Sequence, residues 1–155
     1  MKRRIGTVLL GVLVGGLALL PGVRGSEAAT GPATIRITDS QLSVARMDIA
    51  PRGTSPGDVE VVRQKLFNRR VTTTALGRAQ LICTFVDDRR ERVCQGTYFL
   101  PRGTIVVGGS LQYRQLYELA ILGGTGLYDN ARGMLTVTRT GRTPVRNLVI
   151  FRLAG

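Results

Sequence analysis

Histidine is missing from this 155-residue chain, and cysteine occurs only twice. Zinc and similar metals are held in proteins mainly by histidine and cysteine, so a site of that kind cannot be assembled here. Catalysis by Ser–His–Asp or Cys–His groups is excluded on the same ground. We therefore expect no metal cofactor, and any catalysis must depend on other residue types.

Aromatic side chains are also scarce: Phe and Tyr occur four times each, and Trp is absent. The formal net charge is nevertheless +12, and apart from Lys2 and Lys65 every basic residue is arginine. Such a charge could steer the protein toward anionic partners. The chain has no basic helix and no series of aromatic residues for base stacking, so nucleic-acid binding is not predicted. A solvated basic surface is the simpler interpretation.

Residues 1–29 are typical of a secretory signal peptide. Basic residues at positions 2–4 precede an apolar run over 5–20, and small residues at 26 and 28 suit a cleavage site. The run is shorter than the about 20 residues of a membrane-spanning helix, so no stable span is expected after processing. The sequence therefore predicts a secreted, extracellular protein.

The glycine-rich stretch 120–133 admits two interpretations. An apolar run entering Gly-Gly-Thr-Gly resembles the start of a dinucleotide-binding unit, but that motif needs a helix directly after the glycines. Here Asp129 and Asn130 favour a turn, and residues 134–140 alternate as a strand does. The glycines therefore predict a strand–turn–strand corner, and no nucleotide cofactor is expected.

The rest of the chain consists of short alternating segments separated by turn residues, with no convincing long helix. The first segment ends at Asp39-Ser40, and a helical turn over 62–66 is an alternative within the third. About eight strands at this spacing favour an antiparallel barrel or sandwich, and glycines inside strands favour the barrel. We therefore predict one all-β domain over 30–155, an eight-stranded antiparallel β-barrel. The extended segments, nine when 34–38 and 42–49 are counted separately, are 34–38, 42–49, 58–67, 75–86, 93–100, 105–110, 113–122, 134–140 and 146–153.

The two cysteines lie on either side of a charged hairpin tip at 87–92. If Cys83 faces Cys94, the register also pairs Phe85 with Arg92 and is self-consistent along the hairpin. Two cysteines in an exported chain usually pair. A Cys83–Cys94 disulfide is therefore predicted.

Four stretches, within residues 57–155, resemble the allene oxide cyclase and dirigent-protein barrels. Gly57-Asp58 with Lys65-Leu66-Phe67, and the ending 151–155, are similar to stretches of plant allene oxide cyclases. Gly77-Arg78-Ala79-Gln80 resembles a dirigent strand, and the 120–133 corner is similar to the glycine corner of both groups.

The resemblance implies an eight-stranded barrel, often trimeric, that holds a small hydrophobic molecule and steers its cyclisation or isomerisation. A homo-oligomer, dimer or trimer, would suit it. The chain departs from the plant cyclases by lacking their Glu-containing first-strand motif in 34–56 and by carrying Gln64 in place of their Asn. It also lacks the dirigents' Asp-Asp-Pro stretch, and Cys83 falls where the cyclases have a cavity cysteine. The plant cyclases' own reaction is therefore not predicted.

Glu118 and Tyr113 are the candidate catalytic residues. Glu118 lies in an apolar run, and a carboxylate facing a dry barrel would have a raised pKa and could act as acid or base. Alternatively, its face looks outward or into a subunit interface, with an arginine as partner. Tyr113 could donate a hydrogen bond to a substrate carbonyl.

Arg78, Phe85, Tyr98 and Tyr117 are the candidate ligand-binding residues. Arg78 could hold an anionic or enolic group, or form a structural ion pair with a nearby carboxylate. The two tyrosines could donate hydrogen bonds or simply belong to the core or rim. Phe85 is a candidate for the cavity wall or for plain packing.

Two functions remain open at this point. One is an exported cyclase or isomerase that acts on a polyketide-like or other secondary metabolite by holding it in one conformation. The other is a non-catalytic extracellular binding or surface protein built on the same barrel. A roomy apolar cavity would favour the first, and a barrel filled by its own side chains would favour the second.

Overall fold

A computed structural model describes residues 33–49, 51–70, 73–112 and 114–154. The proposed signal peptide and Tyr113 lie outside these residues. No helix in the described ranges is both long and apolar enough to cross a membrane.

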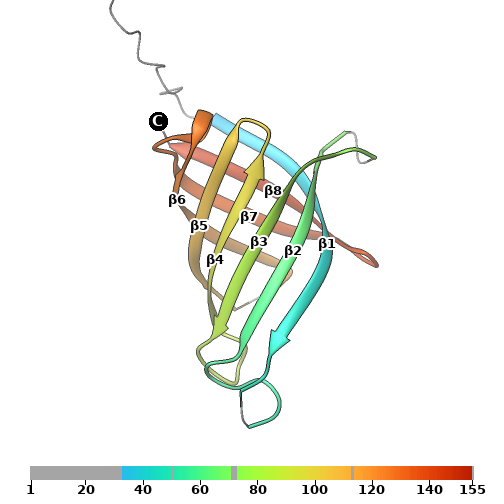
Figure 1. The fold of residues 1–155 in the computed structure, drawn as a ribbon, viewed down its shortest axis with the longest axis vertical. Coiled ribbons are helices and arrows are strands. Elements are labelled where there is room, and N and C mark those ends of the chain that lie inside the picture. Colours follow the sequence, from blue (N-terminus) through green and yellow to red (C-terminus); the bar gives the residue numbers. More distant parts are fainter. Residues whose placement is uncertain (1–32, 50, 71–72, 113, 155) are drawn as a thin grey trace, which may run out of the picture.

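Eight antiparallel strands close into a barrel in which each strand pairs with its neighbours in the chain and β1 pairs with β8 (Figure 1). The predicted fold class is therefore confirmed. The strands are β1 (Ala33–Met47), β2 (Val59–Asn68), β3 (Ala75–Phe85), β4 (Arg92–Leu100), β5 (Gly103–Leu111), β6 (Leu116–Gly124), β7 (Arg132–Arg142) and β8 (Val145–Ala154).

The first strand differs from the sequence prediction. It was expected to end at Asp39-Ser40 and to resume at 42, but β1 runs without interruption from Ala33 to Met47. Its pairing with β2 shifts between Gln41 and Ser43, so Leu42 forms a bulge. The bulge explains why the alternation loses its phase, and Asp39 lies before it, inside the barrel on the same face as Ile37.

The glycine-rich corner behaves as a turn. One turn of 3₁₀ helix, η1 (Gly126–Tyr128), follows β6, and β7 returns antiparallel to β6. Gly126 has φ 64°, and a Cβ atom there would lie 2.4 Å from the Arg102 carbonyl oxygen. Glycine is needed because the chain turns against the β4–β5 connection. The dinucleotide-binding alternative is wrong, because β7 and not a long helix follows the glycines.

The barrel interior is divided between an apolar half and a polar half. Alternate residues of each strand point inward, and the half near η1 is filled by buried apolar side chains. They include Leu66, Tyr98, Ile105, Leu135 and Phe151, each with no exposed surface. In the opposite half, charged and polar groups lie among apolar side chains such as Leu81 and Leu111.

Candidate functional site

The candidate site lies at the barrel end opposite η1, which we call the mouth. Because the strands alternate in direction, the loops after β1, β3, β5 and β7 all lie at this end. The first two of these loops are at the lower end of the molecule in Figure 1, and η1 is at the upper end.

Below the mouth is an inner cavity of about 60 Å³. That volume holds a few water molecules. It is well below the roughly 300–1,000 Å³ of a typical small-molecule pocket. The lining includes Glu60, Gln64, Arg92, Arg114, Tyr117, Arg139 and Asn147.

Asp39 is the central member of a buried hydrogen-bonded group whose other members, Gln64 and Asn147, line the cavity. Strands β2, β1 and β8 lie side by side, and Asn147 is directly opposite Asp39 in the β1–β8 ladder. Gln64 Nε2 donates to Asp39 Oδ2 at 2.9 Å, and Asn147 Nδ2 donates to Oδ1 at 2.7 Å. Burial raises the pKa of Asp39 to about 7, although the hydrogen bonds from Asn147 act in the opposite direction. This carboxyl therefore changes protonation near neutral pH.

Two of the predicted tyrosines point into the barrel. Tyr117 lines the inner cavity, and burial, reinforced by the charge of Asp39, raises the pKa of its hydroxyl. Tyr98 lies deeper, with its ring edge-to-face on Phe151 at a centroid distance of 5.0 Å. Its hydroxyl has no hydrogen-bond partner in the described part of the chain, and burial raises its pKa as well. Both hydroxyls remain protonated at neutral pH and can only donate or accept hydrogen bonds.

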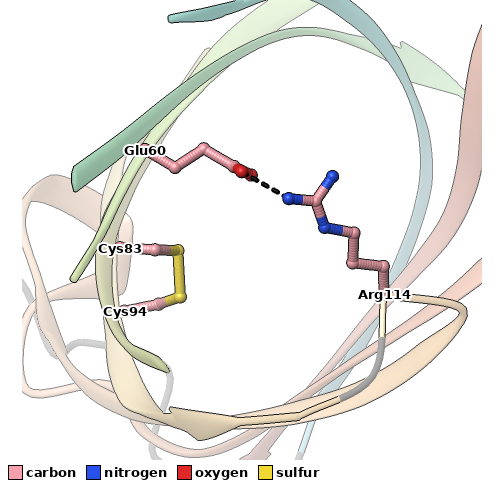
Figure 2. The surroundings of a disulfide bond; sticks show 4 residues. All are labelled: Glu60, Cys83, Cys94 and Arg114. Carbon is pink, nitrogen blue, oxygen red and sulfur yellow. Dashed lines mark hydrogen bonds and ion pairs between the residues drawn. A yellow bond between two sulfur atoms is a disulfide. The ribbon is translucent and has the colours of Figure 1, made fainter. Parts of the chain in front are cut away.

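The predicted hairpin register is confirmed, with Cys83 opposite Cys94 and Phe85 opposite Arg92. The two cysteines form a disulfide that points into the barrel (Figure 2). Phe85 is buried, with the guanidinium of Arg92 5.4 Å and that of Arg46 5.0 Å from its ring centroid. The ring of Phe85 therefore makes cation–π contacts with two arginines of the mouth.

An ion pair reaches across the barrel at the level of the inner cavity. Figure 2 shows Glu60 of β2 and Arg114 of the β5–β6 loop pointing toward each other from opposite sides of the ring. Arg114 Nη2 donates to Glu60 Oε2. Glu60 is buried, whereas the side chain of Arg114 is 49% exposed, so the pair lies at the boundary between cavity and solvent.

Outside this ion pair lies an open groove of about 1020 Å³. Five arginines line it, and Asp87 and Glu91 are its acidic residues. Three of the arginines also line the inner cavity, so the two spaces adjoin. The arginines are Arg89, Arg90, Arg92, Arg114 and Arg139. We call this space the arginine groove.

The loop after β1 is tied to the mouth by Asp58. Arg46 Nη2 donates to Asp58 Oδ2 at 2.6 Å, and the backbone N–H groups of Ile49 and Ser55 donate to the same carboxylate at 2.8 and 3.0 Å. The hydrogen bond from Arg46, followed by that from Ile49, lowers the pKa of Asp58 to about 2. Asp58 is therefore ionised at neutral pH and holds the loop in place.

Glu118 and Arg78 lie on the outer surface. Glu118 is exposed on β6 and accepts a hydrogen bond from Thr136 Oγ1, which in turn accepts one from Arg152. This is the outward orientation that was one of the alternatives, although Arg152 reaches Glu118 only through Thr136, and the carboxylate does not face the barrel interior. Arg78 is exposed on β3, and its guanidinium lies 4.4 Å from the ring centroid of Phe99.

Four polar groups in or behind the cavity wall were not identified as site residues from the sequence: Asp39, Gln64, Asn147 and Glu60. A signal was present, since Asp39 has the same strand parity as Ile35 and Ile37 and was instead assigned to a turn. Arg92 could have been found from its predicted pairing with Phe85 on the inward face. Within the described residues, no three metal-ligating side chains converge.

A family model described as an allene oxide cyclase barrel-like domain matches residues 38–150. No curated protein sequence matches the chain.

Several solved structures share the fold. A pyocyanin demethylase is 24% identical, with a TM-score of 0.66 over 77% of this chain and 100% of its own. The Diels–Alderase AbmU from Streptomyces koyangensis is 18% identical, with a TM-score of 0.63 over 81% and 71% of the two chains. The pterocarpan synthase dirigent protein PsPTS1 is 17% identical, with a TM-score of 0.60 over 79% and 92%. At these identities the likeness concerns the barrel and not the reaction.

Proposed function

The chain belongs to the allene oxide cyclase barrel-like family, and from this we propose that it binds a small organic molecule at the barrel mouth and steers its cyclisation or isomerisation. Similar barrels include proteins described as Diels–Alderases and as dirigent proteins. We further propose that residues 1–29 direct export and that the mature protein is secreted. The buried disulfide supports this proposal, because disulfides are stable in oxidising compartments.

The observation that carries the proposal is the buried polar group beneath the mouth. A buried carboxyl with a pKa of about 7 is unfavourable in a barrel that serves only as a scaffold, because burial of an ionisable group costs stability. Perturbed ionisable groups beside a cavity are instead typical of sites that bind or transform a ligand.

In this proposal Tyr117 is the catalytic residue. Its hydroxyl donates a hydrogen bond to a substrate carbonyl as that oxygen gains negative charge during bond reorganisation. Its raised pKa keeps the proton on the hydroxyl. Asp39 is a positioning residue, because it acts on the cavity through Gln64 and Asn147.

The non-catalytic alternative is favoured by a specific observation, the small volume of the inner cavity. At about 60 Å³ it cannot contain a whole metabolite, so the body of any ligand must lie in the arginine groove. A protein that only binds and carries such a molecule would need nothing more.

Product analysis separates the two functions. Purified protein is incubated with a panel of cyclisable polyenes and enones. Cyclisation and isomerisation leave the mass unchanged, so chromatography separates the products from the substrate and mass detection confirms that they are isomers. We expect isomers of unchanged mass to form faster than in buffer, and Tyr117→Phe to lower the rate by about tenfold or more. Glu118→Gln is the matched control on the outer face and should leave the rate unchanged. If compounds bind at the mouth but are all recovered unaltered, the protein is a binder.

A further inference from the structure

We propose that the arginine groove recognises the carboxylate of an amphipathic organic acid, with Arg92 as the residue that binds it. The inference rests on the proposed function, because it names the class of molecule that the mouth takes.

Arg92 is a buried cation without an ion-pair partner in the described part of the chain. It is 4% exposed, and it forms no ion pair with any carboxylate of the described residues. Its Nε is buried without a hydrogen-bond partner in the same part of the chain. Burial, followed by the nearby charge of Arg114, lowers the pKa of its guanidinium. A buried guanidinium in this state is costly, and an anionic ligand would remove the cost.

The carboxylates of the inner cavity and of the groove do not pair with Arg92. Glu60 is engaged by Arg114. Asp87 accepts a hydrogen bond from the backbone N–H of Glu91, and Glu91 accepts one from Ser110 Oγ. Arg139 also has an unsatisfied hydrogen-bond donor, because its Nε is buried and has no partner among the described residues. Two arginines of the cavity lining therefore each have a buried donor without a partner among the described residues.

The dimensions of the two spaces indicate the shape of the ligand. The inner cavity of about 60 Å³ is large enough for a carboxylate and too small for a ring system. The adjoining groove of about 1020 Å³ can hold an organic body of drug size. A carboxylate is planar and has two acceptor oxygens, which match the paired N–H donors of a guanidinium. The charged end then points inward to Arg92, and the apolar body lies outside near Leu116.

A pair of fluorescent probes tests this directly. 1-Pyrenebutyric acid and 1-pyrenebutanol have the same apolar body and differ in the carboxylate. The chain has no Trp, so its own fluorescence interferes little with titrations. We expect the acid to bind about tenfold or more tightly than the alcohol. Added salt should weaken binding of the acid and leave binding of the alcohol unchanged.

Three substitutions locate the effect. Arg92→Gln should lose about tenfold or more of the affinity for the acid and leave the alcohol unchanged. Glu60→Gln should strengthen binding of the acid, because it frees Arg114 and removes a negative charge. A folding defect cannot imitate a gain of affinity. Arg63→Gln is the matched control, because it removes one positive charge from the exposed side of β2.

The outcomes are distinct. If acid and alcohol bind equally and Arg92→Gln changes neither, the carboxylate inference fails while small-molecule binding at the mouth stands. If neither probe binds, both the inference and the proposed function fail. An equal loss in Arg63→Gln would assign the effect to overall charge and overturn the inference. Should Arg92→Gln not fold, Glu60→Gln and Arg139→Gln decide, with the first expected to gain and the second to lose affinity for the acid.

Discussion

Replacing Asp39 by asparagine should make the protein more stable at neutral and alkaline pH, contrary to what removal of a hydrogen-bonded buried residue usually does. The reason is the raised pKa. Asp39 is 1% exposed, and its pKa in the folded protein is about 7 against an ordinary 3.8. Between these two values the folded state retains a proton that the unfolded state has lost, so the free energy of unfolding falls as the pH rises. A shift of about three units corresponds to ~4 kcal/mol lost by pH 8.

The hydrogen bonds of the site favour the substitution. Gln64 Oε1 is buried without a partner among the described residues, while its Nε2 donates to Asp39. If the Gln64 amide turns over, Oε1 can accept from an asparagine NH₂ at position 39. Asn147 can still donate to the remaining oxygen. The neutral amide therefore meets both partners without a buried charge.

Urea denaturation followed by circular dichroism at pH 5 and pH 8 measures the effect. We expect Asp39→Asn to be more stable than the wild type by up to ~4 kcal/mol at pH 8, and the difference to shrink strongly at pH 5. The chain has no histidine that would titrate between these values. Parallel pH profiles for the two proteins, or a variant less stable at pH 8, would refute the reasoning.

Asp58→Asn is a control in which the change in stability at neutral pH should have the opposite sign. Its pKa is lowered to about 2, so the stability that it contributes is present above pH 4 and is lost as the pH falls through 2. At pH 7 this variant should melt at a lower temperature than the wild type. The difference should narrow on acidification, and stabilisation at pH 7 would contradict the assignment of Asp58 as the group that holds the loop after β1.

Two further predictions concern the scaffold. Replacing Cys83 and Cys94 by alanine should cost about 2–3 kcal/mol, because the disulfide closes a short loop of sequence separation 11; an equal urea midpoint for variant and oxidised wild type would contradict this. Gly133→Ala should cost more than ~2 kcal/mol, because φ is 133° and a Cβ would lie 2.0 Å from the Arg152 carbonyl oxygen. Gly123→Ala is its control, since a Cβ there meets nothing within 4 Å, and equal melting temperatures for the two variants would show that the reasoning is wrong.

Much of the fold could be predicted because it depends on residues close together in the chain. The turn residues at 87–92 and the alternation on either side set the hairpin register, and with it the Cys83–Cys94 pairing. The missing helix after the glycines of 120–133 was enough to exclude a dinucleotide-binding fold. The lack of histidine restricted the chemistry of the site before any geometry was known.

The site itself was only partly predictable, because period-two alternation tells which residues share a face and not which face is inside. Glu118 shares its face with Leu116 and Leu122, and this apolar face is the exposed one. Asp39 was assigned to a turn, although the bulge at Leu42 carries the strand past it.

The sequence by itself determined most of the strands and the hairpin register, since these follow from local alternation and turn residues. Closure of the sheet decided the rest. Only the pairing of β1 with both β2 and β8 brings Gln64 and Asn147 to Asp39, although Asn147 is 108 residues away from Asp39 in the sequence. Only closure removes Arg92 from water, and burial is what changes the energies of these polar groups.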